Sequence, residues 1–181
     1  MSTYNLADRM TVVAGIIDAL HKKGSWCGET HIQKSIYLLQ HACNIPLNYE
    51  YVLYKHGPYS FELSSDLGAM RGSNFVELVF PLQGYGPSVC LTKSGNSIFD
   101  RSQQKLAVAF KKIELVAEWL GKKDVKYLER IATAFYVHSE NPLASSVEKV
   151  RRLKHLKPHI NDIDASSAVS ELSSELSTLA A

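Results

Sequence analysis

The segment YKHGPYSFELSSDL, residues 54–67, decides how the chain is built. Before its glycine, YEYVLY (49–54) is rich in aromatic and β-branched residues, which is typical of a strand. After it, apolar residues recur at helical spacing, at Leu63, Leu67 and Met70. Gly57-Pro58 separates the two patterns. Because proline has a fixed φ and no N–H to lose, we expect Pro58 to open the helix.

The elements around this corner predict a winged helix. Residues 6–23 and a segment that starts near residue 29 carry the apolar periodicity of two helices. Downstream, residues 74–80 and 88–92 have the pattern of strands, joined by a glycine-containing hairpin over 81–87. The predicted order is helix, helix, strand, helix, strand, strand, with the hairpin as the wing.

The rest of the chain is predicted to be helical. Apolar stripes interrupted at Gly121, Asn141-Pro142 and Pro158 divide it into successive helices, the last of which is serine-rich and marginal alone, so it should dock or fray. We therefore expect an α+β, mostly helical protein. A winged-helix-like domain over 1–103 would carry a helical extension over 104–181 packed on it.

Composition argues for a protein of the cytoplasm. No apolar run reaches the ~20 residues of a membrane span, and the N-terminus lacks the apolar core of a secretory signal. Three cysteines indicate a reducing setting. The net charge is +2, but residues 148–159 hold five bases and one acid and are followed by an acidic tail. Such segments usually pair within the molecule or stay solvated, and the alternative is a partner-binding surface.

An ordered set of motifs resembles a widespread bacterial and phage family, the Panacea antitoxin domain group and the winged-helix proteins near it. The set comprises HIQKSIYLLQ (31–40), the corner at 49–67, VCLTKSGNSIF (89–99), YLERIATAFYV (127–137) and EKVRRLKHLKPHI (148–160). The resemblance spans roughly residues 30–160. The serine-rich last helix departs from the family pattern, which leaves open any partner contact made by the C-terminal part.

The resemblance implies a non-enzymatic protein that binds a protein partner, either a toxin encoded by a neighbouring gene or a phage-defence protein. Some members are plausible DNA binders. The positions that match the family motif are Gln33, Lys34, Tyr37, Tyr54, Gly57, Pro58, Tyr59 and Ser60.

The residue patterns do not predict a metal, a cofactor or a catalytic centre. The His and Cys residues between positions 21 and 43 fit no closed zinc spacing, so we expect a packed Cys43 and surface histidines. His56 could act as a general base beside Ser60. The simpler expectation is that Ser60 caps a helix.

Large rings in predicted connections favour protein binding, because aromatic residues often anchor interfaces. The expected partner-binding residues are Trp26, Tyr37, Tyr59, Phe61 and Tyr85. Trp26 and Phe61 could instead close the small core.

Binding of DNA by a transcriptional regulator is the alternative function. The predicted recognition helix carries Glu62 and Asp66, which would repel phosphates, and the wing has no lysine or arginine. Nucleic acid, or an acidic partner, would therefore have to meet bases elsewhere: Lys122, Lys123, Lys149, Arg151, Arg152 and Lys154. The sequence predicts no oligomeric state.

Overall fold

The computed structural model describes residues 4–80, 86–102 and 106–180. It opens with helices α1 (Leu6–Lys22) and α2 (Glu29–His41), which confirms both predicted segments. Asn5 caps α1 by accepting a hydrogen bond from the N–H of Asp8. Gly28 precedes α2, and no side chain caps that helix.

The corner folds differently from the prediction. Strands β1 (Val52–Tyr54) and β2 (Gly57–Tyr59) form an antiparallel hairpin in which Leu53 lies opposite Pro58. Pro58 therefore does not open a helix, and that expectation was wrong. Its fixed φ also suits an edge strand, where its missing N–H costs nothing.

The next helix, α3 (Phe61–Gly72), begins three residues after Pro58 and has Ser60 as its N-cap. Strands β3 (Val76–Val79) and β4 (Ser88–Leu91) then pair antiparallel, with Val76 opposite Leu91, and α4 (Lys93–Ser102) follows. Both predicted strands are confirmed in shorter form. Most of the predicted hairpin turn, residues 81–85, lies outside the described residues.

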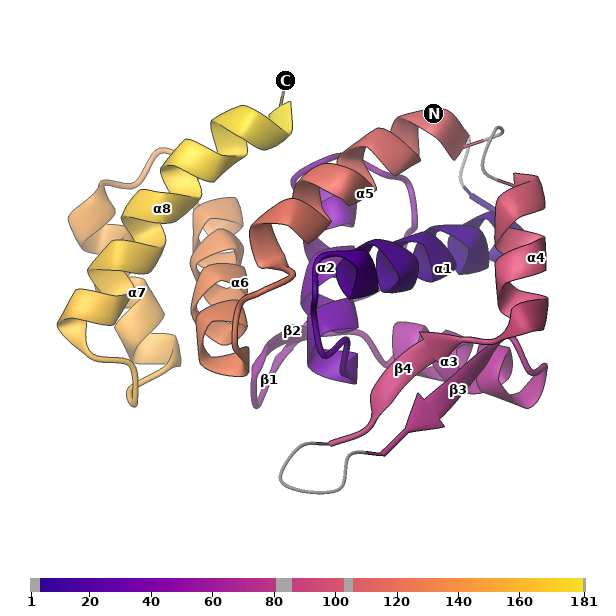
Figure 1. Ribbon diagram of the computed structural model, residues 1–181. Helices are drawn as coiled ribbons and strands as arrows, with labels where there is room; N and C mark the ends of the chain where they lie inside the picture. The colour runs from indigo at the N-terminus through magenta and orange to yellow at the C-terminus, as the bar shows by residue number, and fades with distance from the viewer. Residues whose placement is uncertain (1–3, 81–85, 103–105, 181) are drawn as a thin grey trace.

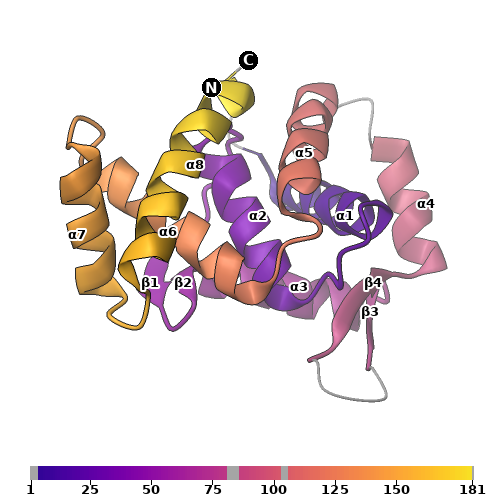
Figure 2. The same ribbon diagram turned by 60° about the vertical axis from the view of Figure 1, so that its left-hand side comes forward.

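Four further helices confirm the all-helical prediction for the second half: α5 (Ala107–Leu120), α6 (Val125–Glu140), α7 (Ser146–Leu156) and α8 (Asp162–Ala180). Asp124 caps α6, and Ser145 with Glu148 forms a capping box on α7. Helices α6, α7 and α8 lie side by side at one end of the molecule, and α4 and the β3–β4 hairpin lie at the other (Figures 1 and 2). The serine-rich α8 is docked there, with Leu172 and Leu179 buried.

One hydrophobic core runs through both halves. Helix α5 packs against α1 and α2, and α6 packs against α2 and β2. Helix α2 is thus covered on most sides, and every residue from His31 to Leu39 is buried. The result is a mostly helical α+β fold with two small antiparallel sheets in the described residues. None of the helices in those ranges combines the length and the apolar character needed to cross a membrane.

Gly57 fits the corner for two reasons. Its φ is +86°, in the left-handed region that side chains disfavour. A Cβ placed there would lie 3.1 Å from Thr133 Oγ1 on α6. A side chain at this position would therefore strain the backbone and crowd Thr133 where the hairpin packs against α6.

Gly57→Ala should lower the free energy of unfolding by about 1–3 kcal/mol, because both the backbone strain and the contact with Thr133 act in the folded state. Urea denaturation measures this change. Gly68→Ala, within α3 and with no heavy atom near its Cβ, is the control and should be neutral or raise stability by up to about 1 kcal/mol. Equal stabilities of the two variants would contradict the strain at Gly57.

Candidate functional site

Gln33, on α2, forms hydrogen bonds with the corner, the β1–β2 hairpin and Ser60. Its Nε2 donates to the Ser60 carbonyl and its Oε1 accepts from the Ser60 N–H, both at 2.9 Å. The Ser60 hydroxyl accepts from the Leu63 N–H at 3.2 Å, which confirms the predicted cap. Both side chains are fully buried. The Ser60 hydroxyl is therefore closed off from solvent and engaged at the start of α3.

Lys34 holds the corner next. Its side chain is buried, with 2% of the residue exposed, and its Nζ donates to the Pro58 carbonyl at 2.8 Å. Burial, and next the nearby Lys157, lower the pKa of Lys34 to about 8, although Glu129 and Glu29 oppose the shift. The sequence predicted no contact for Lys34, although it matches the family motif. In the structure, Lys34 supports the corner.

Lys157, from the C-terminal half, binds the turn between β1 and β2. Its Nζ donates to the Tyr54 carbonyl at 2.8 Å and the Lys55 carbonyl at 2.6 Å. It also forms an ion pair with Glu129, whose Oε1 lies 3.2 Å away. Sequence analysis missed Lys157 and Glu129. The sequence signal that could have identified the pair was Glu129, an acid among the mostly apolar residues on the buried face of α6.

Two histidines surround the same carboxylate. His159 Nε2 lies 3.3 Å from Glu129 Oε1, and His56 Nδ1 lies 3.7 Å from Oε2. His56 therefore lies beside the carboxylate that also pairs with Lys157.

Outside this support lies a cluster of three rings, Tyr54, Tyr59 and Phe61, which we call the aromatic patch. Its ring centroids are 5.7 Å (Tyr54–Tyr59), 6.0 Å (Tyr54–Phe61) and 5.2 Å (Tyr59–Phe61) apart. Phe61 is 62% exposed and Tyr54 57% exposed. Half-exposed Val52 lies opposite Tyr59 across the hairpin and extends the apolar surface. The patch brings together two predicted partner-binding residues and one motif residue.

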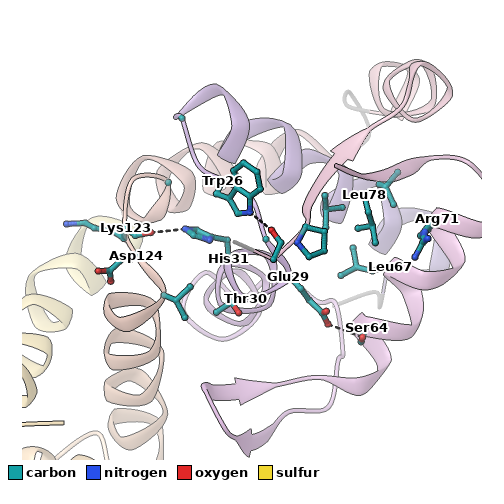
Figure 3. A pocket seen from close by; sticks show the side chains of 18 of the residues that line it. Trp26, Glu29, Thr30, His31, Ser64, Leu67, Arg71, Leu78, Lys123 and Asp124 are labelled. Atoms are coloured by element: carbon teal, nitrogen blue, oxygen red, sulfur yellow. Dashed lines mark hydrogen bonds between the residues drawn. The ribbon is translucent and has the colours of Figure 1, made fainter. Parts of the chain in front are cut away.

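Glu29 connects the patch to a groove. Its Oε1 accepts from the Tyr59 hydroxyl at 2.8 Å and from the Ser64 hydroxyl at 3.0 Å. Beyond Glu29, a groove of about 640 Å³ lies between the start of α2, α3, the β3–β4 hairpin and the α5–α6 turn (Figure 3). Burial is the main reason that the pKa of Tyr59 is raised, so its hydroxyl keeps its proton and donates to Glu29 at neutral pH.

The other predicted partner-binding residues have different surroundings. Trp26 lies on the edge of the groove, is 37% exposed, and donates from Nε1 to the Gly86 carbonyl at 2.8 Å. Tyr37 is 3% exposed and packs edge-on against Tyr51 and Phe135, so its assignment as a surface contact was wrong. Covering of α2 by its neighbours explains the burial. Tyr85 lies outside the described residues.

Several of the predicted basic contacts are engaged within the molecule. Arg152 binds the Glu140 carboxylate through Nε and Nη2 at 2.9 and 3.0 Å, and Lys154 lies 2.5 Å from Asp162. Lys149 donates to the Pro142 carbonyl at 2.9 Å, and Arg151 is exposed. The intramolecular pairing expected for this basic segment is therefore present. Lys122 and Lys123 line the groove instead.

The histidines and cysteines near the first helices do not converge. His31 is buried, and its Nε2 donates to the Lys123 carbonyl at 2.8 Å, whereas His21 Nε2 binds the Val89 carbonyl. Burial lowers the pKa of His31 and favours its neutral form. The expectation of a surface histidine was therefore wrong for His31. Within the described ranges, no three His, Cys, Asp or Glu side chains are placed to hold a metal ion.

No protein-family model and no curated protein sequence matches the chain. The family resemblance of the motif set therefore stays a prediction.

Lys34 should make stability depend on pH in a defined direction. Its pKa is about 8 in the folded protein and near 10.5 in the unfolded chain, so between these values the unfolded chain binds more protons. The stability of the wild type relative to Lys34→Met should therefore rise with pH above about 8, by up to about 1.4 kcal/mol per pH unit.

Urea denaturation of both proteins at intervals from pH 7 to 10 measures this difference. Comparing the two proteins cancels the titration of tyrosines and cysteines that both share. A difference that stays flat or falls with pH would contradict the buried, desolvated state of Lys34.

Proposed function

We propose that this chain is a non-enzymatic partner-binding protein of the cytoplasm, antitoxin-like or a phage-defence accessory subunit, that acts through protein–protein contacts. The aromatic patch carries the proposal. Three mutually packed rings on the surface, two of them more than half exposed, are the residue type that most often anchors an interface.

Rigid presentation supports the same function. The patch is carried by the β1–β2 hairpin and the first residue of α3, and the carbonyls of this corner are bound by Lys34, Lys157 and Gln33. A surface already ordered in the free protein loses little conformational entropy on binding. The support around the corner therefore favours affinity as well as stability.

The family resemblance agrees with this proposal. The pattern of elements in the sequence predicts, in addition, that residues 1–103 form a winged-helix-like module on which residues 104–181 are packed. The β3–β4 hairpin follows α3, as a wing would, while β1 pairs with β2 in a separate sheet. The motif residues belong to the corner or its support: Gln33, Lys34, Gly57, Pro58 and Ser60.

DNA binding is less well supported than protein binding. On α3, Asp66 is engaged by Arg9 at 3.1 Å and by the Tyr49 hydroxyl at 2.8 Å, and Glu62 accepts from the Glu50 N–H. Arg9 compensates the charge of Asp66, but Glu62 is bound only by a neutral N–H and leaves negative charge on the helix that would have to enter a groove of DNA. Arg152 and Lys154, two of the bases that could compensate, are paired with carboxylates.

The Tyr54→Ala/Phe61→Ala double variant should abolish recovery of a protein partner when the tagged chain is purified from its native host. Each ring should contribute about 1–3 kcal/mol of binding free energy, so the loss should exceed tenfold. Quantitative mass spectrometry against an untagged culture measures recovery. Leu143→Ala/Val108→Ala, which truncates exposed apolar residues elsewhere on the surface, is the matched control.

A partner recovered equally with both variants would place the interface elsewhere. A wild-type chain that is recovered alone, or that binds its own upstream DNA at low salt, would contradict the proposed function.

A further inference from the structure

The β1–β2 hairpin leaves one of its two long edges open. Because Pro58 has no N–H, it and Leu53, which lies opposite, cannot exchange a pair of hydrogen bonds. In an antiparallel ladder, the two residues of such a non-bonded pair direct their N–H and C=O groups away from each other's strand. The N–H and C=O of Leu53 therefore point outward from the free side of β1.

The two edges of the hairpin differ in how these outward groups are treated. On the β2 side, those of Pro58 and Ser60 are bound by side chains of α2. On the β1 side, Tyr51 precedes Leu53 by two residues and, because an extended chain alternates, presents its groups in the same direction. No group in the described ranges forms a hydrogen bond with the backbone of Tyr51 or Leu53 on this side.

This open edge is short, because it is closed at both ends. At one end, Gln40 on α2 accepts from the Tyr49 N–H at 2.8 Å and donates to the Tyr49 carbonyl at 2.9 Å. At the other end, Lys157 binds the Lys55 carbonyl at 2.6 Å. Two backbone donors and two backbone acceptors therefore remain between the closed ends.

The side of β1 that carries these groups is also accessible and unprotected. Strand β2 packs against α2 and α6, whereas no other helix or strand of the described residues packs extensively along β1. Val52 is 48% exposed and Tyr54 57% exposed, and the strand contains neither a charged residue nor a proline. Charged residues and prolines are the side chains that usually prevent an edge strand from pairing with another strand.

A second copy of the chain offers the same four groups in the arrangement that this edge requires. With a two-fold axis at Val52, Tyr51 of each copy lies opposite Leu53 of the other, and each such pair exchanges two hydrogen bonds. All four open groups of both copies are then bonded. The side chains match as well, because Val52 meets its own copy and Tyr54 lies opposite Glu50, so no like charges face each other.

We propose that two copies of the chain associate through β1, antiparallel about a two-fold axis at Val52, so that the two hairpins form one four-stranded sheet. Because α2 closes the outer edge of β2 in each copy, the assembly ends at two copies. The exposed faces of both hairpins stay on the same side of this sheet, which brings the two aromatic patches together. The interface is small, so we expect a dissociation constant of roughly 1–100 µM. This inference does not depend on the proposed function.

Sedimentation equilibrium of the full-length chain, from about 1 to about 300 µM, measures the association and should show a reversible monomer–dimer equilibrium. Leu53→Pro removes an outward N–H that the hairpin itself does not use, and proline is tolerated at such edge positions. Since half of the bonds between the copies are lost, dimerisation should weaken at least tenfold. Leu53→Ala truncates the same side chain but keeps the N–H, so its dissociation constant should stay within about threefold of the wild type.

Val52→Lys provides a second arm, which decides the test if Leu53→Pro does not fold. It places like charges directly opposite each other at the axis and should abolish dimerisation over this concentration range. Val147→Lys, at an exposed valine of α7, is its control and should dimerise like the wild type. Thermal melts establish that each variant is folded.

A wild-type chain that stays monomeric over the whole range would overturn the inference, and the edge would then be open to a strand of another protein. Dimerisation of Leu53→Pro or Val52→Lys with the affinity of its control would overturn it too, because the copies would then associate through another surface. Neither result would affect the proposed function, which depends on recovery of a partner through the aromatic patch.

Discussion

Two buried lysines, one from each half of the chain, donate hydrogen bonds to backbone carbonyls of the same corner. Lys34 on α2 binds the Pro58 carbonyl, and Lys157 after α7 binds those of Tyr54 and Lys55. Burying an ammonium group is costly unless its hydrogens are bonded and its charge is compensated. Glu129, 3.2 Å from Lys157, supplies the compensating charge. The arrangement is stable only while the corner, α2 and α6 are together, so it joins the two halves into one cooperative unit.

The hairpin depends on this support because it is too small to be stable alone. Its strands have three residues each, and an isolated two-stranded hairpin of that length is marginal in water. Gln33 and the two lysines replace the neighbouring strands that would normally satisfy its backbone groups. In return, the hairpin holds the aromatic patch in one arrangement. The hydrogen bonds on the buried side of the hairpin therefore also fix the position of the aromatic patch on its exposed side.

Much of the architecture could be predicted from local signals. Apolar periodicity located α1, α2 and the four helices of the second half, and Ser60 was identified as a cap from its chemistry alone. Pro58 was misplaced because its φ suits both a helix start and an edge strand. What decides between them is the left-handed Gly57 packed against Thr133, a contact between residues far apart in the sequence.

The candidate site was predicted less completely, for a related reason. Tyr54, Tyr59 and Phe61 are close in sequence, and their presence at an exposed corner follows from local pattern. The burial of Tyr37 and Lys34 does not, because it depends on α5, α6 and β2 covering α2. Lys157 and Glu129 were missed because nothing local distinguishes a lysine that crosses the molecule from one that is solvated. The groove likewise arises only where four separate elements meet.

Native-state hydrogen exchange at the Ser60 amide tests the central claim most directly, since this N–H is bound by Gln33 inside the supported corner. The account predicts that it exchanges only through global unfolding, with the same opening free energy and urea dependence as the amides of α2. Exchange through a local opening of about 1–2 kcal/mol, insensitive to urea, would show that the corner moves independently of the core and would contradict the account.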